Sequence, residues 1–216
     1  GVRLVGSEMC IRDRIYPIGF AANSYILTED GKNAVVVDPA QPRIADELEK
    51  RGLTPAFVLL THAHFDHVGG VSALQKRGAR VLCSEREKTL VGSPADLSEE
   101  FGAPRSEFTV DGVLKDGETR ELCALSVTAI ATPGHTAGGM CYLVRGADGT
   151  GALFTGDTLF AGSIGRADFP TGDMAALRKS LKRLAALEGD FPVYAGHEED
   201  TTLEEERRTN PFMRDA

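Results

Sequence analysis

The histidines constrain this chain more than any other residue type, because each lies in a Gly- or Asp-containing segment beside an apolar run. The sequence has five of them: His62, His64, His67, His135 and His197. Imidazole is the commonest side-chain ligand for a borderline metal such as zinc. A single histidine is more often a hydrogen-bonded structural residue, but the placement of all five predicts a metal site.

Four potential ligands lie within six residues, in a block with the pattern HxHxDH. His62 and His64 alternate in an extended segment, so both side chains can point to one side, and Asp66 and His67 follow where the chain turns into a helix. One tetrahedral ion rarely takes so many ligands from one loop, so the spacing favours two neighbouring ions with a shared ligand. Asp157 follows an apolar run and is a candidate for that bridging carboxylate, although an aspartate there could also cap a turn.

The length of 216 residues fits one domain with a sizeable buried core. Residues 1–14 show neither the period of two that strands have nor the 3.6-residue period of helices. They look like translated adapter sequence joined to a gene fragment. We therefore expect a single domain over residues 15–216, preceded by an extraneous or disordered segment.

The net charge and the cysteine content restrict which binding partners and which cellular compartment we expect. The formal net charge is −8, whereas binding to nucleic acid or to an anionic membrane needs a basic face. No stretch reaches the ~20 apolar residues of a membrane helix. The 4 cysteines are scattered without a CxxC pair, which argues against a disulfide framework or a thiolate zinc site. We predict free thiols and a cytoplasmic location.

Apolar runs separated by turn residues predict an alternation of strands and helices. Strands are expected at 24–28, 34–37, 57–60, 80–83, 118–122, 126–131, 140–145, 151–155 and 191–194. Helices are expected at 42–51, 68–77, 85–91 and 202–208. One more helix should begin after a capping Asp173 and carry its leucines on one side. The pattern suggests mixed sheets flanked by helices, an α/β arrangement.

Several motifs together resemble one family. The HxHxDH block is accompanied by TPGHT at 132–136, TGDTLF at 155–160 and a late Gly196-His197. This set is similar to the metallo-β-lactamase superfamily, and within it to glyoxalase II (hydroxyacylglutathione hydrolase)-like enzymes of the short bacterial type without an added helical domain. The resemblance implies a four-layer αββα sandwich with the site at one edge of the two sheets.

The resemblance also implies a ligand set for two divalent metal ions, zinc being expected and iron or manganese also acceptable. One ion would be held by His62, His64 and His135. The second would be held by Asp66, His67 and His197, with Asp157 shared between them. Asp38, at the end of its strand, would support the ligand loop from behind, or would simply start a turn before Pro39.

The function that the resemblance implies is hydrolysis of a thioester, such as S-lactoylglutathione or a related acyl-thiol. Zinc lowers the pKa of bound water toward about 7, so hydroxide is available at neutral pH. Asp66 could orient this water as well as bind metal. Arg166 would bind a carboxylate of the substrate, since a guanidinium does so bidentately; the alternative is a surface arginine paired with Asp168.

Other functions of the same fold stay open. Persulfide dioxygenases resemble this family but need a single iron held by two histidines and one aspartate. The segments Phe65-Asp66-His67 and Gly196-His197 fit the pattern with two ions better. A β-lactamase and a non-catalytic binding module are further alternatives, and the second is weakened because every ligand position is retained.

Overall fold

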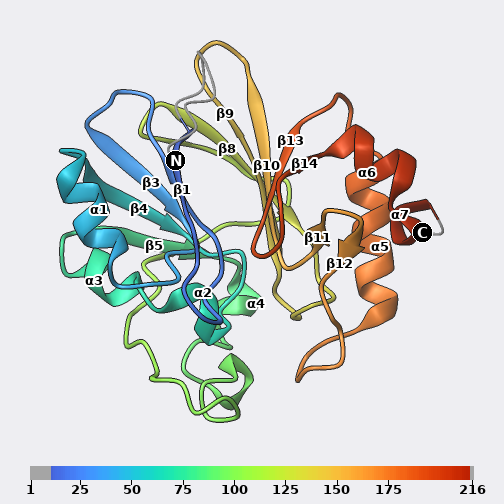
Figure 1. Cartoon of the computed structure of the whole chain (residues 1–216), viewed down its shortest axis with the longest axis horizontal. Coiled ribbons are helices and arrows are strands. Elements are labelled where there is room, and N and C mark those ends of the chain that lie inside the picture. Colours follow the sequence, from blue (N-terminus) through green and yellow to red (C-terminus); the bar gives the residue numbers. More distant parts are fainter. Residues whose placement is uncertain (1–10, 215–216) are drawn as a thin grey trace.

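Two six-stranded sheets face each other in the computed structural model, which describes residues 11–214 (Figure 1). The strand order is β1-β2-β3-β4-β5-β6 in the first sheet and β14-β13-β10-β9-β8-β7 in the second. Both sheets are mixed: β3 to β6 are parallel neighbours, whereas β7 to β10 are antiparallel neighbours and β13 runs parallel to β10. The sequence correctly predicted an α/β chain with mixed sheets.

The elements have the following bounds. The first sheet contains β1 (Ile11–Ile15), β2 (Ser24–Leu27), β3 (Asn33–Val37), β4 (Thr54–Leu59), β5 (Arg80–Cys83) and β6 (Gly112–Val113). The second contains β7 (Thr119–Leu122), β8 (Leu125–Ala131), β9 (Met140–Arg145), β10 (Gly151–Gly156), β13 (Pro192–Ala195) and β14 (Thr201–Thr202). A separate hairpin is formed by β11 (Leu159–Phe160) and β12 (Ser163–Ile164).

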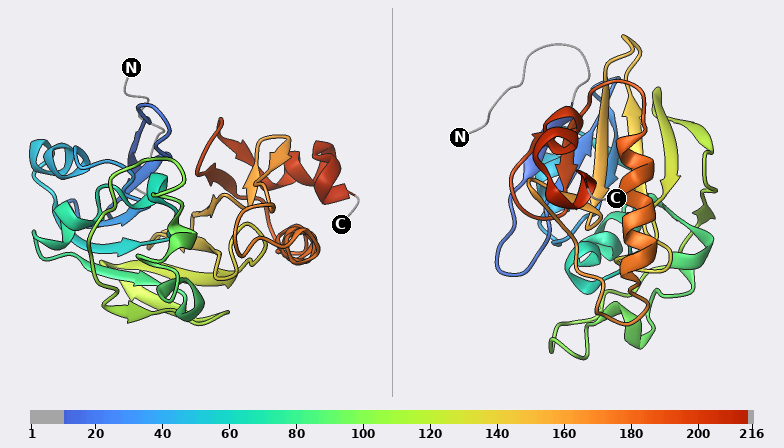
Figure 2. Two further views of the ribbon diagram at one scale, coloured as in Figure 1. Left: turned by 90° about the horizontal axis from the view of Figure 1, so that it is seen from below. Right: turned by 90° about the vertical axis from the view of Figure 1, so that its right-hand side faces the viewer.

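The helices form two groups on opposite sides of the molecule. On one side lie α1 (Ile44–Lys50), α2 (Phe65–Val68), α3 (Val71–Gln75) and α4 (Glu85–Lys88), followed by the short 3-10 helix η1 (Pro94–Asp96). On the other side lie α5 (Met174–Ala185), α6 (Leu203–Thr209) and α7 (Pro211–Arg214). Figure 2 shows from two further directions that α1 and α3 are separated from α5 to α7 by the strands.

Three buried clusters hold the layers together. One packs Ile44 and Leu48 of α1 against Val36 and Val58 of the first sheet. A second lies between the two sheets, and a third packs the leucine stripe of α5 on the outer face of the second sheet. Strands buried on both faces explain all-apolar runs such as the valines of β3. The expected four-layer αββα sandwich is therefore confirmed.

The side chains of α5 follow the sequence prediction closely. Asp173 Oδ1 accepts hydrogen bonds from the backbone N–H groups of Ala175 and Ala176, at 2.8 and 3.0 Å. Leu177 and Leu184 on the inner face are fully buried, while the basic residues of this helix are exposed. The cap and the apolar stripe together set where the helix begins and which side packs on the sheet.

The N-terminal boundary differs in part from the expectation. Residues 11–15 form β1, which pairs antiparallel with β2, so the last part of the predicted extraneous segment belongs to a strand. Arg14 forms an ion pair of 2.7 Å with Asp200. The rest of the predicted segment, residues 1–10, lies outside the described residues. That the segment is extraneous stays a prediction.

The helix expected at 68–77 is wrong in its bounds, because the chain forms two short helices, α2 and α3, interrupted at Gly69 and Gly70. Gly70 donates a 2.6 Å hydrogen bond from its N–H to the carbonyl of Pro39. A Cβ on Gly70 would lie 2.4 Å from the carbonyl oxygen of Gln41. The loop after β3 therefore packs directly against Gly69 and Gly70, where the helix is interrupted. The helical period of the sequence gives no sign of this contact.

We expect Gly70→Ala to lower the free energy of unfolding by about 3 kcal/mol, because the added methyl group collides with backbone that cannot move freely. Gly78→Ala is the control: it has a φ of +95° and open space around the Cβ, so only backbone strain of about 1–2 kcal/mol is expected. Urea unfolding of both variants measures the difference. Equal midpoints would show that the close contact at Gly70 carries no special cost.

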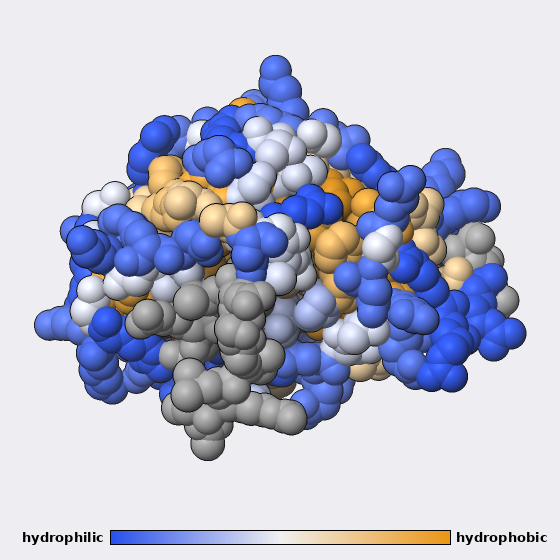
Figure 3. Space-filling view, turned by 90° about the horizontal axis from the view of Figure 1, so that it is seen from above, coloured by the Kyte–Doolittle hydropathy of each residue, from blue (hydrophilic) through white to orange (hydrophobic). Residues whose placement is uncertain are grey.

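None of the helices in residues 11–214 has the length and apolar character needed to cross a bilayer. On the face shown in Figure 3, hydrophilic side chains cover most of the surface and apolar ones form patches between them.

Candidate metal centre

Each predicted ligand follows the end of a strand. The HxHxDH block follows β4 of the first sheet and ends in α2. His135 follows β8, Asp157 follows β10 and His197 follows β13, all strands of the second sheet. The two sheets therefore bring ligands from four distant parts of the chain to one edge of the sandwich.

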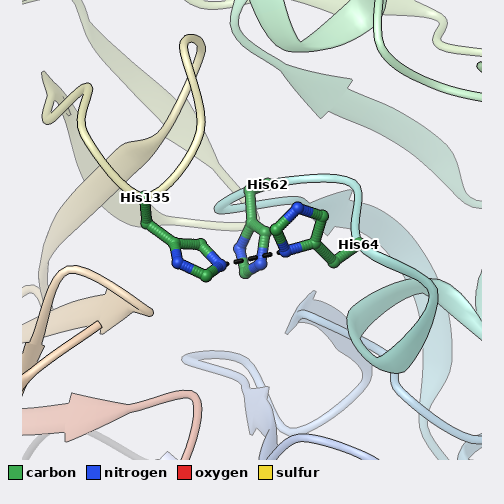
Figure 4. A group of neighbouring side chains, drawn as sticks. All are labelled: His62, His64 and His135. Carbon is green, nitrogen blue, oxygen red and sulfur yellow. Dashed lines mark hydrogen bonds between the residues drawn. The ribbon is translucent and has the colours of Figure 1, made fainter. Parts of the chain in front are cut away.

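His62, His64 and His135 form the first group. Their ligand atoms all lie within 4.8 Å of one another, and all three residues are buried. His135 Nε2 lies 2.9 Å from His64 Nδ1, and the three side chains point toward one another (Figure 4). This is the arrangement that three imidazoles need in order to hold one ion.

Asp66, His67 and His197 form the second group, again with ligand atoms within 4.8 Å of one another. His197 Nε2 lies 3.1 Å from Asp66 Oδ2. Asp157 stands between the groups: its carboxylate oxygens are 3.2 Å from His67 Nε2, 3.7 Å from His197 Nε2 and 3.6 Å from His135 Nε2. Its position fits the shared ligand that the sequence predicted.

Asp38 lies behind the first block of ligands. Its carboxylate accepts hydrogen bonds from Thr61 N (2.8 Å) and Thr61 Oγ1 (2.6 Å), and it lies 2.9 Å from His67 Nδ1. The potential ligand atoms of Asp38, His62 and His67 also lie within 4.8 Å of one another. Because these contacts already occupy the carboxylate, we assign it a supporting role and not a ligand role. Its φ of 46° is a conformation that aspartate tolerates better than most residues.

Hydrogen bonds to the histidine rings determine which ring nitrogen of each faces the metal site. Carbonyl and carboxylate oxygens only accept, so His67 Nδ1 donates to Asp38 and His135 Nδ1 donates to the carbonyl of Arg166, at 2.7 Å. The Thr61 hydroxyl gives its proton to Asp38 and can accept from His62 Nδ1, 3.1 Å away. In the neutral rings, Nε2 of His62, His67 and His135 is then left with a free lone pair.

Burial and neighbouring charges favour the neutral forms of His62 and His64. Burial lowers the pKa of His62 well below its ordinary value, and the neighbouring His67 adds to this effect. Burial and the nearby His135 lower the pKa of His64 to about 3. Neutral imidazole is the form that binds metal.

The carboxylates of Asp66 and Asp157 surround His67 with negative charge, which a bound cation would balance. Burial lowers the pKa of His67, but the carboxylates of Asp157 and Asp66 outweigh it and raise the pKa well above its ordinary value. Burial raises the pKa of Asp157, yet the neighbouring His67 outweighs it and lowers the value. Among the described residues, buried atoms without a hydrogen-bond partner include His62 Nε2, His64 Nε2, His67 Nε2 and Asp157 Oδ1. Buried lone pairs without a hydrogen-bond partner, drawn from both groups of candidate ligands, fit bound divalent cations.

Glu87 of α4 is a buried residue at this site that the sequence analysis missed. Its Oε1 accepts from Ala63 N and its Oε2 from Thr136 Oγ1, both at 2.8 Å. It therefore joins the loop of His62 and His64 to the loop of His135. Burial raises the pKa of this carboxyl to about 7. The sequence offers only a weak signal for this role: Glu87 is three residues before Leu90 and so shares its helical face.

Arg166 lines the cavity at the metal centre but is paired within the chain. Its guanidinium donates two hydrogen bonds of 2.6 Å to the carboxylate of Asp168. It also lies 3.8 Å from the ring centre of Phe169. The structure thus contains the pair that the sequence offered as the alternative role, and contact between Arg166 and a substrate stays a prediction.

With this geometry established, comparison with known proteins identifies the class. The chain belongs to the metallo-β-lactamase superfamily, whose family pattern matches residues 17–197. The hydroxyacylglutathione hydrolase GloC of Haemophilus influenzae is 35% identical over 211 residues, which cover 92% of this chain and 96% of that protein.

Solved structures show the same relationship. The B3 metallo-beta-lactamase BLEG-1 has a TM-score of 0.85 and 32% identity, over 93% of this chain and 98% of that one. TTHA1623, solved in a di-iron-bound form, has a TM-score of 0.80 and 33% identity, over 93% and 99% of the two chains. The family and the fold that the motifs predicted are therefore confirmed.

Proposed function

We propose that this protein is a hydrolase that uses two divalent metal ions to cleave a small-molecule thioester. The observation that carries the proposal is the placement of Asp157 between two complete groups of three potential ligands. Two-metal sites place ions ~3.5–4 Å apart with a shared ligand. The similarity to a hydroxyacylglutathione hydrolase supports a thioester as the substrate class.

In this proposal His62, His64 and His135 hold one ion, Asp66, His67 and His197 hold the other, and Asp157 is shared. When bound, such ions lower the pKa of a coordinated water and stabilise negative charge on a carbonyl oxygen. The carboxylate of Asp66 lies at the open side of the second group, with its side chain 16% exposed, and could orient the attacking water. A thiolate needs little protonation to leave, which suits a thioester.

Zinc is the proposed metal, with iron or manganese as alternatives, because mixed His and Asp sites accept all three. The relative solved with two irons supports a binuclear site and leaves the choice of metal to experiment. Three free cysteines in the described part of the chain, Cys83, Cys123 and Cys141, are consistent with the reducing compartment that we propose, the cytoplasm.

Metal removal tests the proposal directly. We expect about two ions per chain in the purified protein, and a loss of hydrolysis by at least about 10²–10³-fold after chelation, restored by adding zinc. Metal quantification should accompany a panel of thioesters that includes S-lactoylglutathione, with a β-lactam as a comparison substrate.

Three outcomes would overturn the proposal in different ways. Full activity of the metal-free protein would exclude the metal mechanism. One iron per chain, with oxygen uptake on a persulfide and no thioester cleavage, would establish the dioxygenase alternative. Turnover of the β-lactam alone would keep the metal site and replace the substrate class.

A further inference from the structure

A cavity of about 570 Å³ opens over the metal centre, and its lining is rich in aromatic side chains. Ligand sites of this type usually have volumes of roughly 300–1,000 Å³. Besides His64, His135, Asp157 and His197, the lining includes Phe20, Phe65, Phe101, Phe160, Ile164 and Phe169. These apolar residues have no part in holding metal, so they are free to contact a substrate.

Three of the phenylalanines form a continuous surface, here called the aromatic wall: Phe65, Phe101 and Phe169. The Phe65 and Phe101 rings stack with centroids 5.3 Å apart, and Phe101 meets Phe169 edge to face at 6.0 Å. Phe169 in turn meets the His64 ring at 5.9 Å. The wall therefore starts with Phe169 beside a proposed metal ligand, continues through Phe101, which is 45% exposed, and ends at Phe65.

The charges around the cavity do not favour a strongly anionic substrate. Of the lining residues in the described part of the chain, Arg166 is the one with a fixed positive charge, and Asp168 neutralises it through two hydrogen bonds. Glu198 adds a negative charge at the rim. A glutathione thioester has two carboxylates, and a cavity built for it would need unpaired cationic groups to receive them.

We propose that the aromatic wall binds an apolar arm of the substrate, so that the preferred substrates are thioesters of low charge with an aromatic or long aliphatic group. This inference rests on the proposed hydrolase function and narrows its substrate class. An apolar arm would cover the exposed face of Phe101 and remove both surfaces from water. Its thioester carbonyl would then lie near His64 and the shared Asp157, where the wall begins.

A pair of thioesters tests this assignment in the metal-loaded protein. S-acetyl- and S-phenylacetyl-N-acetylcysteamine share an uncharged thiol and differ only in the apolar arm. We expect kcat/KM to be at least about tenfold higher for the phenylacetyl compound, as for added apolar groups in other pockets. Phe101→Ala should remove most of this preference by lowering kcat/KM for the phenylacetyl compound.

Phe212→Ala is the matched control, because Phe212 is 43% exposed, lies on α7 and is not part of the cavity lining. This variant should keep the full preference. Equal kcat/KM for the two compounds in the wild type, an unchanged preference in Phe101→Ala, or a higher kcat/KM for S-phenylacetylglutathione than for the uncharged compound would overturn the proposal.

Binding separates failure of the wall from failure of the hydrolase function. The thioether S-phenethyl-N-acetylcysteamine lacks the cleavable bond, and calorimetry should show that Phe101→Ala binds it about tenfold more weakly than the wild type and Phe212→Ala do. If no thioester is cleaved but this difference appears, the hydrolase function fails and the wall stands. If thioesters are cleaved without this difference, the wall is overturned. A concentration-dependent dimer that Phe101→Ala dissociates, again without this difference, would assign the wall to a second copy of the chain.

Discussion

Replacing His64 by alanine is expected to remove the first metal ion and to lower kcat/KM for thioester hydrolysis by at least about 10²–10³-fold. His64 is 3% exposed and its Nδ1 lies 2.9 Å from His135 Nε2, so in the proposed site no solvent-exposed side chain can replace it as a ligand. Metal content per chain, measured by mass spectrometry on the purified variant, and steady-state kinetics check this together.

A control must separate metal loss from misfolding, because His64 also packs on Phe169. Thermal melts of the metal-free wild type and the metal-free variant provide it. Similar midpoints, with a lower midpoint for the variant only when metal is present, would locate the effect at the metal centre. A variant that kept two ions and wild-type kinetics would show that His64 is not a ligand.

The clustering of the candidate ligands could be predicted from sequence because their positions depend on local order. Strands of a sandwich end at its edges, so polar residues placed directly after apolar runs are brought together there. His135 and Asp157 each follow the strand that the sequence predicted, β8 and β10. Mixed sheets flanked by helices followed from the same runs, because strands covered on both faces, such as β3, need partners on either side. The four-layer arrangement came from the family resemblance.

Other features could not be predicted because they depend on contacts between distant segments. Glu85 and Glu87 look alike in the sequence, and only the packing of α4 against two ligand loops buries the second of them. The aromatic wall draws Phe65 of α2, Phe101 and Phe169 from separate segments of the chain. The break at Gly69 and Gly70 arises from the carbonyl groups of a loop about thirty residues earlier in the chain.

Replacing His197 by alanine is expected to remove the second ion and leave the first, so that metal content falls from about two ions per chain to about one. The two groups of ligands are distinct, since His197 contacts Asp66 and Asp157 but belongs to no group with His62 or His64. Its side chain is 32% exposed, so truncation opens the site to solvent and leaves no buried void. Hydrolysis should fall by about 10²-fold or more, because only one cation then stabilises the developing charge. Metal analysis and kinetics on the same preparation measure both effects.

This variant distinguishes a two-ion hydrolase from a single-iron oxidoreductase. A single iron held by two histidines and one aspartate needs only part of the ligand set, and His135 and Asp157, whose side chains approach to 3.6 Å, can belong to such a set without His197. An enzyme of that type would keep its iron and most of its oxygen uptake in His197→Ala. Unchanged metal content with retained activity would therefore contradict a second ion bound by Asp66, His67 and His197. If the variant loses one ion and loses hydrolysis with it, the reaction needs that ion, because the substitution leaves the first group of ligands in place.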